Sequence, residues 1–334
     1  MKIFLTGSTG FIGSHLVRRL AWTEHKLCCL VRETSQVGEL EKLGANLITG
    51  DITDRDSLLR GMNGCEWLVH LASRYELWVP DKRVYRQVNI DGVRNVMEAA
   101  LETGIRKVVL VSTVAVYGNA EWPITEKSQL GAKCPSEYAR SKRAGETIAW
   151  ELYKEKRLPL VVIYPGAVIG ADDPKAAGRY IKNFARGRMP AQIVTYSMFP
   201  FVHVRDVCEA ILLALEKKGN NGEKYIVAKH NVTFGEFNKM ICKIAGSKPP
   251  LLRMPNPLAL LSARVLTELA DLVKKAPILD MAFDQVSLMK QGFLVDGSKA
   301  ERELGLTYTP LRVGVEEAIA CFTGEHHFRG RRPA

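Results

Sequence analysis

The feature that most constrains the fold of this 334-residue chain is the alternation of two kinds of segment over its first two-thirds. Short runs that are apolar on both faces and rich in β-branched residues alternate with amphipathic, helix-forming stretches. The strand-like runs are KIFLTG, KLCCLVR, ANLITGD, EWLVHLA, KVVLVST, LPLVVIYPG and, at 223–228, EKYIVA. Helices are expected over 11–20, 54–62, 84–103 and 136–156. This alternation predicts an α/β fold, a doubly wound parallel sheet with helices on both faces.

Beyond residue 166 the pattern loosens, which predicts a second and smaller lobe. Gly, Pro and Asp interrupt residues 170–200, and 232–334 is mostly helix-forming with proline-rich joints. A helix over 203–217 and the strand at 223–228 are expected to return to the sheet. We therefore predict a sheet domain over 1–169, to which 203–230 returns, and a mostly helical lobe over 170–202 and 231–334.

Composition bounds the class of protein. No apolar run reaches the ~18–20 residues needed to cross a bilayer, and the opening MKIFLTGSTGFIG is broken by Gly, Ser and Thr too early for a signal peptide. The seven cysteines are scattered, without a C-x-x-C pair or a His–Cys cluster at metal-ligand spacing. They are typical of free thiols in a reducing compartment. We expect a soluble cytoplasmic protein without a metal site.

The net charge of +11 raises the question of an acidic partner. The basic residues are dispersed and are not interleaved with aromatic residues as in RNA-binding modules, so nucleic acid is not the expected partner. The one dense basic run, at 326–334, is predicted to be a solvated tail. A basic surface also suits an anionic cofactor, a nucleotide-linked substrate or an anionic membrane face, and charge alone does not choose among them.

A glycine-rich loop follows the first predicted strand and opens the first predicted helix. In TGSTGFIG the glycines allow a tight turn, let backbone N–H groups approach a pyrophosphate, and permit close packing of helix on strand. The positive end of the helix dipole then faces the phosphates. This context predicts a dinucleotide site rather than an ordinary strand–helix turn. Its residues are Gly7, Ser8, Thr9, Gly10, Phe11, Ile12 and Gly13.

The end of the second strand bears on the choice of dinucleotide. Arg32 stands at the tip, where a base suits the 2′-phosphate of NADP, and Ser8 is placed to help it. Glu33 follows at once and leaves NAD open, and a solvated Arg32 is the alternative. Asp51, ending the third strand, is placed to accept a hydrogen bond from the adenine amine; capping of the next helix is its other role, which Asp54 can also fill.

Tyr138 and Lys142 in YARSK lie one turn apart on a predicted helix, so they project from the same face. A nearby ammonium favours the phenolate and is expected to lower the pKa of the tyrosine towards neutral pH. Ser112 and Thr113 end the fifth strand, at the carboxyl edge of the sheet where ligands bind in doubly wound folds. Either hydroxyl is placed to hold a substrate oxygen while Tyr138 exchanges its proton. Asn89 either supports this relay or is bonded locally in its helix.

These motifs resemble a known family. TGSTGFIG, GDITD, VHLAS, VNIDGVRNVMEAA, VSTVAVYG, YARSK and FVHVRDV occur in the order seen in extended short-chain dehydrogenase/reductases, the NAD-dependent epimerase/dehydratase family. SRYELWVPD, AAGRYIKNFARGRMPA and YPGAVIG look like its branch of dihydroflavonol 4-reductase-like proteins and hopanoid-associated sugar epimerases. The N-V-Y-G-P of nucleotide-sugar epimerases is absent, which disfavours such a substrate.

The resemblance implies a Rossmann fold and a set of site residues. Thr113 matches the catalytic Ser/Thr, with Ser112 its neighbour, and Tyr138 and Lys142 match the Y-x-x-x-K pair. His203 and Asp206 match positions that hold the lobes together. The cofactor would also contact Ile52, Leu71, Ala72, Ser73, Asn89, Pro165 and Val168.

The chemistry implied by the resemblance is hydride transfer between a secondary carbinol and a nicotinamide, with Tyr138 as the proton donor or acceptor. Dehydratases usually carry an acid after the catalytic Ser/Thr, whereas Val114 stands here, so dehydration is disfavoured. NADP suits an exchanging cofactor and a net ketone reduction, which is the leading expectation. The alternatives are a sugar or nucleotide-sugar epimerase that retains NAD, and a non-catalytic dinucleotide-binding regulator.

The substrate is expected to be a small carbonyl compound, alcohol or sugar, and it could be lipid-like or polycyclic. Tyr75 and Trp78 follow the fourth strand and are expected near the substrate mouth, and Arg179 is placed to recognise an anionic group or to be solvated. The apolar-rich stretch 256–273 is read first as a helix packed within the small lobe. Its alternative is an apolar pocket or a shallow membrane-facing surface for a lipid-like or polycyclic substrate. By analogy with the family, a homodimer is expected through 84–103 and 136–156.

Overall fold

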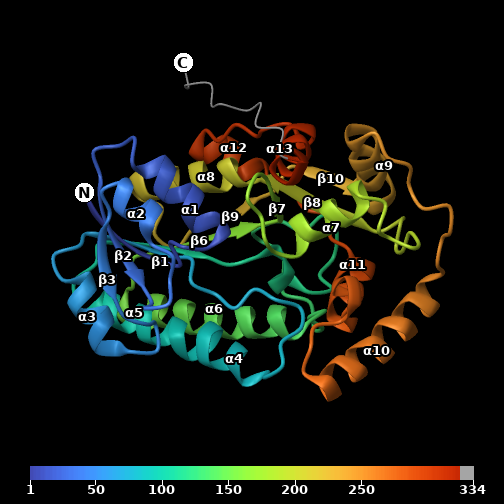
Figure 1. Cartoon of the computed structure of the whole chain (residues 1–334). Helices are drawn as coiled ribbons and strands as arrows, with labels where there is room; N and C mark the ends of the chain where they lie inside the picture. The colour runs from blue at the N-terminus through green and yellow to red at the C-terminus, as the bar shows by residue number, and fades with distance from the viewer. Residues whose placement is uncertain (324–334) are drawn as a thin grey trace.

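A seven-stranded parallel sheet runs through the middle of the molecule (Figure 1). The computed structural model describes residues 1–323, so the basic run at 326–334, the predicted solvated tail, lies outside the described residues. The strand order is β3-β2-β1-β4-β5-β6-β9, and every neighbouring pair is parallel. The strands are β1 (Lys2–Thr6), β2 (Lys26–Val31), β3 (Asn46–Thr49), β4 (Trp67–His70), β5 (Lys107–Val111), β6 (Leu160–Pro165) and β9 (Lys224–Val227).

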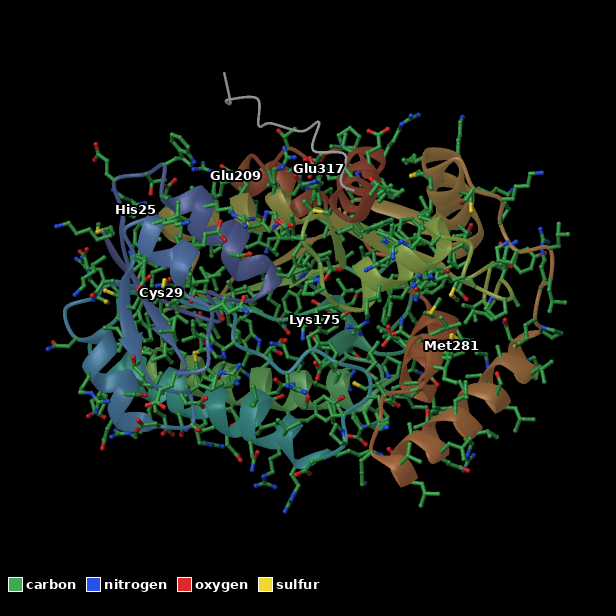
Figure 2. The ribbon with its side chains drawn as sticks, in the orientation of Figure 1. His25, Cys29, Lys175, Glu209, Met281 and Glu317 are labelled. Carbon is green, nitrogen blue, oxygen red and sulfur yellow. The ribbon has the colours of Figure 1, made fainter. Side chains whose placement is uncertain are left out.

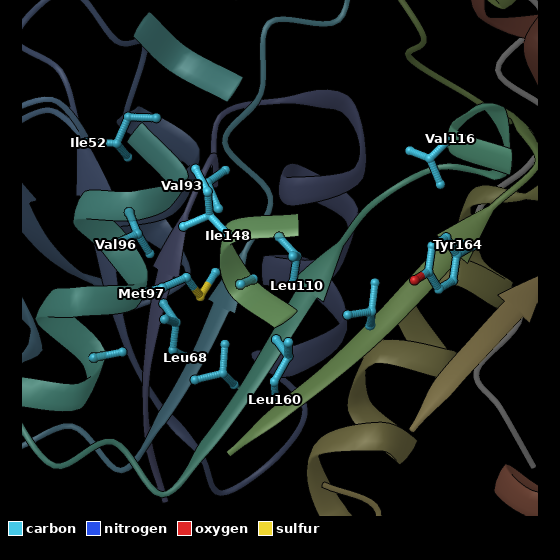
Figure 3. Close-up of a cluster of buried hydrophobic side chains, with 14 of the residues drawn as sticks. Ile52, Leu68, Val93, Val96, Met97, Leu110, Val116, Ile148, Leu160 and Tyr164 are labelled. Carbon is cyan, nitrogen blue, oxygen red and sulfur yellow. The ribbon is translucent and has the colours of Figure 1, made fainter. Parts of the chain in front are cut away.

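Helices cover both faces of this sheet, because successive strand residues point to opposite sides. In β1, Phe4 joins the core on one face, whereas Ile3 and Leu5 join the core on the other. The first core, part of which is drawn in Figure 3, is closed by α3 (Arg55–Met62), α5 (Gly92–Glu102) and α6 (Glu137–Lys156). The second is closed by α1 (Phe11–Leu20), α8 (Val204–Glu216) and α12 (Ser298–Leu304). The predicted doubly wound parallel sheet is therefore confirmed.

A smaller sheet and further helices stand beyond the carboxyl end of the large sheet (Figure 1). The strands of the smaller sheet are ordered β10-β8-β7, with β7 parallel and β10 antiparallel to β8. A third core, built around Phe184, Phe201 and Phe237, joins these strands to the helices. The elements are β7 (Ala167–Ile169), β8 (Met198–His203), β10 (His230–Thr233), α7 (Ala176–Ala185), α9 (Phe234–Ala245), α10 (Asn256–Val273), α11 (Phe283–Gln291) and α13 (Leu311–Thr323).

Local patterns placed most helices to within a residue or two, but the stretch expected as one helix over 84–103 is divided. It consists of α4 (Arg83–Arg86), a π-helical turn η1 (Gln87–Asp91) and α5. A π turn inserts one residue into the helical ladder and redirects the backbone beside it. The remaining short elements are α2 (Gly38–Lys42) and the 3₁₀ turns η2 (Val114–Tyr117) and η3 (Ile278–Asp280).

Buried polar contacts join the C-terminal segments to the sheet side of the molecule. His203 contacts Glu317 of α13 through Nε2 and Oε2, 3.0 Å apart, and Asp206 accepts hydrogen bonds from the N–H and hydroxyl of Thr309. Figure 2 shows Glu317 on the helix that covers this side. Both residues thus lie where parts of the chain distant in sequence meet. Among residues 1–323, no helix is long and apolar enough to cross a membrane.

Candidate active site

The glycine loop is held in a shape that only glycine allows at two positions. Gly7 has φ 76°, and a Cβ there would lie 2.6 Å from the backbone nitrogen of Ala72. A Cβ on Gly13 would lie 2.1 Å from the carbonyl oxygen of Gly7, so α1 packs directly on the loop. Gly10 precedes α1, and its carbonyl accepts from Ser14. The backbone N–H groups at the start of α1 are therefore presented beside the loop, as a phosphate site requires.

Three side chains converge where β5 ends beside α6. Thr113 follows β5, and Tyr138 and Lys142 lie one turn apart near the start of α6, which Ser136 caps by accepting from Ala139 N–H at 3.1 Å. Thr113, Tyr138 and Lys142 line a single cavity of about 250 Å³ together with the glycine loop. The sequence-predicted proton-transfer residues and the predicted phosphate loop thus open into the same space.

Burial, rather than the lysine, dominates the titration of Tyr138. Desolvation raises the pKa of the phenol, the nearby Tyr75 raises it further, and a hydrogen bond with Thr113 opposes this. Burial also lowers the pKa of Lys142 to about 8, while its ammonium donates to the carbonyl of Val111 at 2.9 Å. The expectation that Lys142 lowers the pKa of Tyr138 in the protein alone is therefore wrong. The phenol is protonated at neutral pH.

Ser112 is held by a carboxylate and does not share the position of Thr113. Its hydroxyl donates to Glu146 at 2.5 Å, and Glu146 also accepts from the hydroxyl of Tyr164 and the indole N–H of Trp150. Ser112 therefore joins β5 to α6, and both Ser112 and Thr113 line the cavity. Glu146 was not among the predicted site residues, although its position four residues after Lys142, on the same helical face, was a usable signal.

Asn89 lies in the π turn and holds the loop after β4. Its side-chain oxygen accepts from the hydroxyl of Ser73 and the N–H of Arg74, and its amide donates to Ser141 of α6. Its backbone carbonyl faces Gly145, where a Cβ would lie 1.9 Å away. These partners lie outside the helix of Asn89, so its side chain is not bonded locally as one alternative predicted; it joins the loop at Ser73 and Arg74 to α6.

The other predicted cofactor residues divide into two groups. Those that line the cavity are Phe11, Ile12, Leu71, Ser73, Pro165 and Val168. Ala72 backs on Gly7, Ile52 is buried in the first core, and Thr9 is exposed. The hydroxyl of Ser8 is fully buried inside the loop, which argues against its predicted help to Arg32 at a 2′-phosphate.

Arg32 and Asp51, the residues predicted to meet the adenine end of the cofactor, follow the carboxyl ends of β2 and β3. Arg32 follows β2 with its side chain exposed, and its backbone N–H donates to the hydroxyl of Ser35. Asp51 accepts from the N–H and hydroxyl of Thr53 through one carboxylate oxygen, Oδ1. Asp54 caps α3, so this capping role does not fall to Asp51.

Of the three predicted substrate residues, only Tyr75 lies at the cavity. Its ring meets that of Tyr138 edge to face, with centroids 5.0 Å apart. Trp78 instead donates to Asp271 at 2.8 Å, and Arg179 donates to Asp280 at 2.5 Å. Both side chains line a neighbouring hollow rather than the cavity itself.

The remaining cavity wall is mostly aromatic and aliphatic. It is contributed by β8, α7, α9 and α11, which are far apart in sequence, so local patterns did not reveal it. Lys175, near the centre of Figure 2, also lines the cavity and pairs with Glu76 at 3.2 Å. The apolar side chains are Tyr180, Phe199, Phe201, Phe234, Phe237, Leu288, Met289 and Phe293.

Known proteins resemble this chain in both sequence and architecture. The model of the NAD dependent epimerase/dehydratase family matches residues 3–228. Sterol demethylase protein B of Methylococcus capsulatus is 31% identical over 96% of this chain and 98% of its own length. A Synechocystis protein provisionally named a dihydroflavonol 4-reductase is 30% identical over 96% of this chain and 94% of its own.

A solved structure agrees with these relatives. The crystal structure of the protein gox2253 is 34% identical and superposes with a TM-score of 0.83 over 98% of this chain and 99% of that one. The family model spans the sheet, the glycine loop and α6, which carry the candidate site. This chain therefore belongs to the NAD-dependent epimerase/dehydratase family and is an NAD(P)-dependent enzyme of the extended short-chain dehydrogenase/reductase type.

Proposed function

We propose that this enzyme is an NADP(H)-dependent reductase that interconverts a ketone and a secondary alcohol on an apolar, lipid-like or polycyclic molecule. The observation that carries the proposal is the contrast within the cavity. Tyr138 and Thr113 present hydroxyls at one wall, whereas β8, α9 and α11 supply a wall of aromatic and aliphatic side chains. Such a wall favours an apolar skeleton whose oxygen is fixed at one point. We also propose that 170–202 and 231–334 form the substrate lobe, around a sheet domain of 1–169 with 203–230.

The residues present fit a dinucleotide. The start of α1 and the loop around Gly10 would hold the pyrophosphate, Lys142 the ribose hydroxyls, and Pro165 would pack beside the nicotinamide. When bound, the dinucleotide supplies or accepts the hydride. The chain itself supplies the oxygen site: Thr113 and Tyr138 would donate hydrogen bonds to the substrate carbonyl, and Tyr138 would deliver its proton to that oxygen.

Tyr138 carries a proton that it can donate in the reducing direction. Burial raises the pKa of the phenol, so a proton is available at neutral pH. A general acid must carry its proton into the transition state, as ketone reduction requires. Val114, fully enclosed, occupies the place where a dehydratase would carry its acid. These features support reduction over dehydration.

Two assays test the proposed reaction. Native mass spectrometry of the purified enzyme should show a chain that takes up added NADPH, because a reductase exchanges its cofactor every turnover. Incubation with apolar ketones should then oxidise NADPH and yield alcohol in equal amounts. Tightly held NAD, together with epimerised sugar and no net NADPH oxidation, would support the epimerase instead.

A substitution at the tip of β2 tests the cofactor preference. Arg32→Ala is expected to weaken NADPH binding by about tenfold or more and to change NADH binding little, because a guanidinium pairs with phosphate strongly. Fluorescence titration measures both affinities. Glu33→Ala is the matched variant and should leave NADPH binding unchanged. A loss of NADH binding in Glu33→Ala, with no effect of Arg32→Ala, would assign the site to NAD.

A further inference from the structure

Helix α10 is amphipathic in the reverse of the usual sense. Small side chains face the protein: Ala259 and Ala263 are fully buried, and Ala270 is 4% exposed. Large aliphatic side chains recur every three or four residues on the solvent side, at Leu258, Leu261, Val265, Leu269 and Leu272, which are 48–79% exposed. A helix that faces water normally turns its large apolar residues inwards. The spacing of these side chains therefore indicates that the outer face of α10 contacts a nonaqueous partner.

The apolar surface continues past both ends of the helix. Leu251 and Leu252 precede α10, Val273 is its last residue and Ile278 follows it, and all four side chains are more than half exposed. In Figure 1, α10 lies at the edge of the molecule and packs on α11. We name this surface the outer ridge; it consists of Leu251, Leu252, Leu258, Leu261, Val265, Leu269, Leu272, Val273 and Ile278. Exposed large apolar side chains in such number along one segment are typical of an interaction surface.

Basic side chains flank the outer ridge. The stretch 248–275 contains five Lys and Arg but two acids, Glu268 and Asp271. Glu268 pairs with Arg264 at 3.2 Å, and Asp271 accepts from Trp78 and lies 4.0 Å from Lys82. The basic residues, all exposed, are Lys248, Arg253, Arg264, Lys274 and Lys275. An apolar ridge with a cationic border is complementary to an anionic lipid surface.

The outer ridge ends beside the way into the cavity. A second hollow is lined by Trp78 and Pro80 from the loop after β4 and by Ala276 and Pro277 directly after α10. It shares Tyr75, Leu77, Ala176 and Gln285 with the catalytic cavity. The two spaces therefore lie next to each other and share part of their walls. A molecule that left a surface covering the C-terminal end of α10 would meet this hollow before it met Tyr138.

We propose that the outer ridge docks on an anionic lipid bilayer, with α10 lying in the interface, and that the apolar substrate passes from the bilayer through the second hollow to Tyr138. The docking rests on the outer ridge and its basic border; the passage of substrate rests on the proposed reductase function. A second copy of the chain fits the same surface poorly, because it would bring the two like-charged borders together.

Vesicle flotation tests the docking without any need for turnover. The probes are vesicles of phosphatidylcholine and vesicles in which about a third of the lipid is phosphatidylglycerol. The wild-type chain should float with the anionic vesicles, and Leu261→Glu/Leu269→Glu should lower the bound fraction by about tenfold or more, because both positions enter the interface. Lys274→Gln/Lys275→Gln should reduce the preference for anionic vesicles. Trp22→Glu, at an 88% exposed site before β2, is the matched control and should float like wild type.

Three results would overturn the docking proposal. They are wild-type protein that stays with the soluble fraction, a Leu261→Glu/Leu269→Glu variant that floats like wild type, and a wild-type dimer that this variant splits without any lipid binding, as measured by light scattering. NADPH titration checks that each variant is folded, since α10 contributes nothing to the cofactor residues. Flotation without reduction of a water-miscible ketone would count against the reductase and leave the docking standing.

Discussion

Tyr138→Phe is expected to lower turnover by about a thousandfold or more while NADPH binding is retained. The substitution removes the hydroxyl that we propose delivers a proton to the substrate oxygen, and general acid catalysis contributes about 10²–10⁴-fold. The ring stays, so its packing against Tyr75 at 5.0 Å and the shape of the cavity are kept. Steady-state assays and fluorescence titration of NADPH measure the two effects separately.

A second tyrosine provides the control for that variant. The hydroxyl of Tyr85 donates to the carbonyl of Glu76 at 2.7 Å and stands outside the cavity. Tyr85→Phe should therefore keep turnover within a few-fold of wild type. Unchanged turnover in Tyr138→Phe would remove Tyr138 from the proton-transfer role and with it the proposed chemistry.

Lys142→Met is expected to lower turnover by about 100-fold or more and yet to stabilise the fold at neutral pH. Burial lowers the pKa of Lys142 from 10.5 to about 8, which corresponds to about 3 kcal/mol of cost for the buried ammonium. The lost hydrogen bond to Val111 offsets about 1 kcal/mol of this gain. Methionine has a similar length and no charge, so the site stays filled.

The stability gain expected for Lys142→Met depends on pH. Between pH 8 and 10.5 the unfolded chain binds a proton at Lys142 that the folded chain does not, so wild-type stability rises with pH in that window. The advantage of Lys142→Met should be fully present below pH 8 and should disappear as the pH rises through 10.5. Urea unfolding at several pH values measures it. Lys154→Met, at an exposed site on the same helix, should match wild type throughout; a similar gain there would refute the account.

Local signals in the sequence were enough for much of the fold. The expected helices 11–20 and 256–273 coincide with α1 and α10, because the apolar period and the flanking glycine and proline residues act within the segment itself. The glycine loop was equally local. The π turn over 87–91 could not be predicted from local signals. It accompanies the packing of Asn89 against Gly145, which is distant in the chain.

The site required contacts that no local pattern contains. Ser112 and Thr113 are adjacent and chemically alike, and only the position of Glu146 separates their roles. Ser8 is enclosed by packing that the motif does not specify. The pKa of Tyr138 depends on burial by several elements at once, so the YARSK spacing alone gave the wrong direction. The apolar wall is assembled from β8, α7, α9 and α11, whose residues meet only in the folded chain.

The helical face shared by Tyr138, Lys142 and Glu146 has an evolutionary consequence. Glu146 fastens this helix to two central strands through Ser112 and Tyr164, so the three residues can shift only as a unit. The aromatic wall belongs to other segments and is free of that anchorage. Substitutions in the aromatic wall can therefore change the substrate specificity of a related protein while Tyr138, Lys142 and Glu146 keep their arrangement.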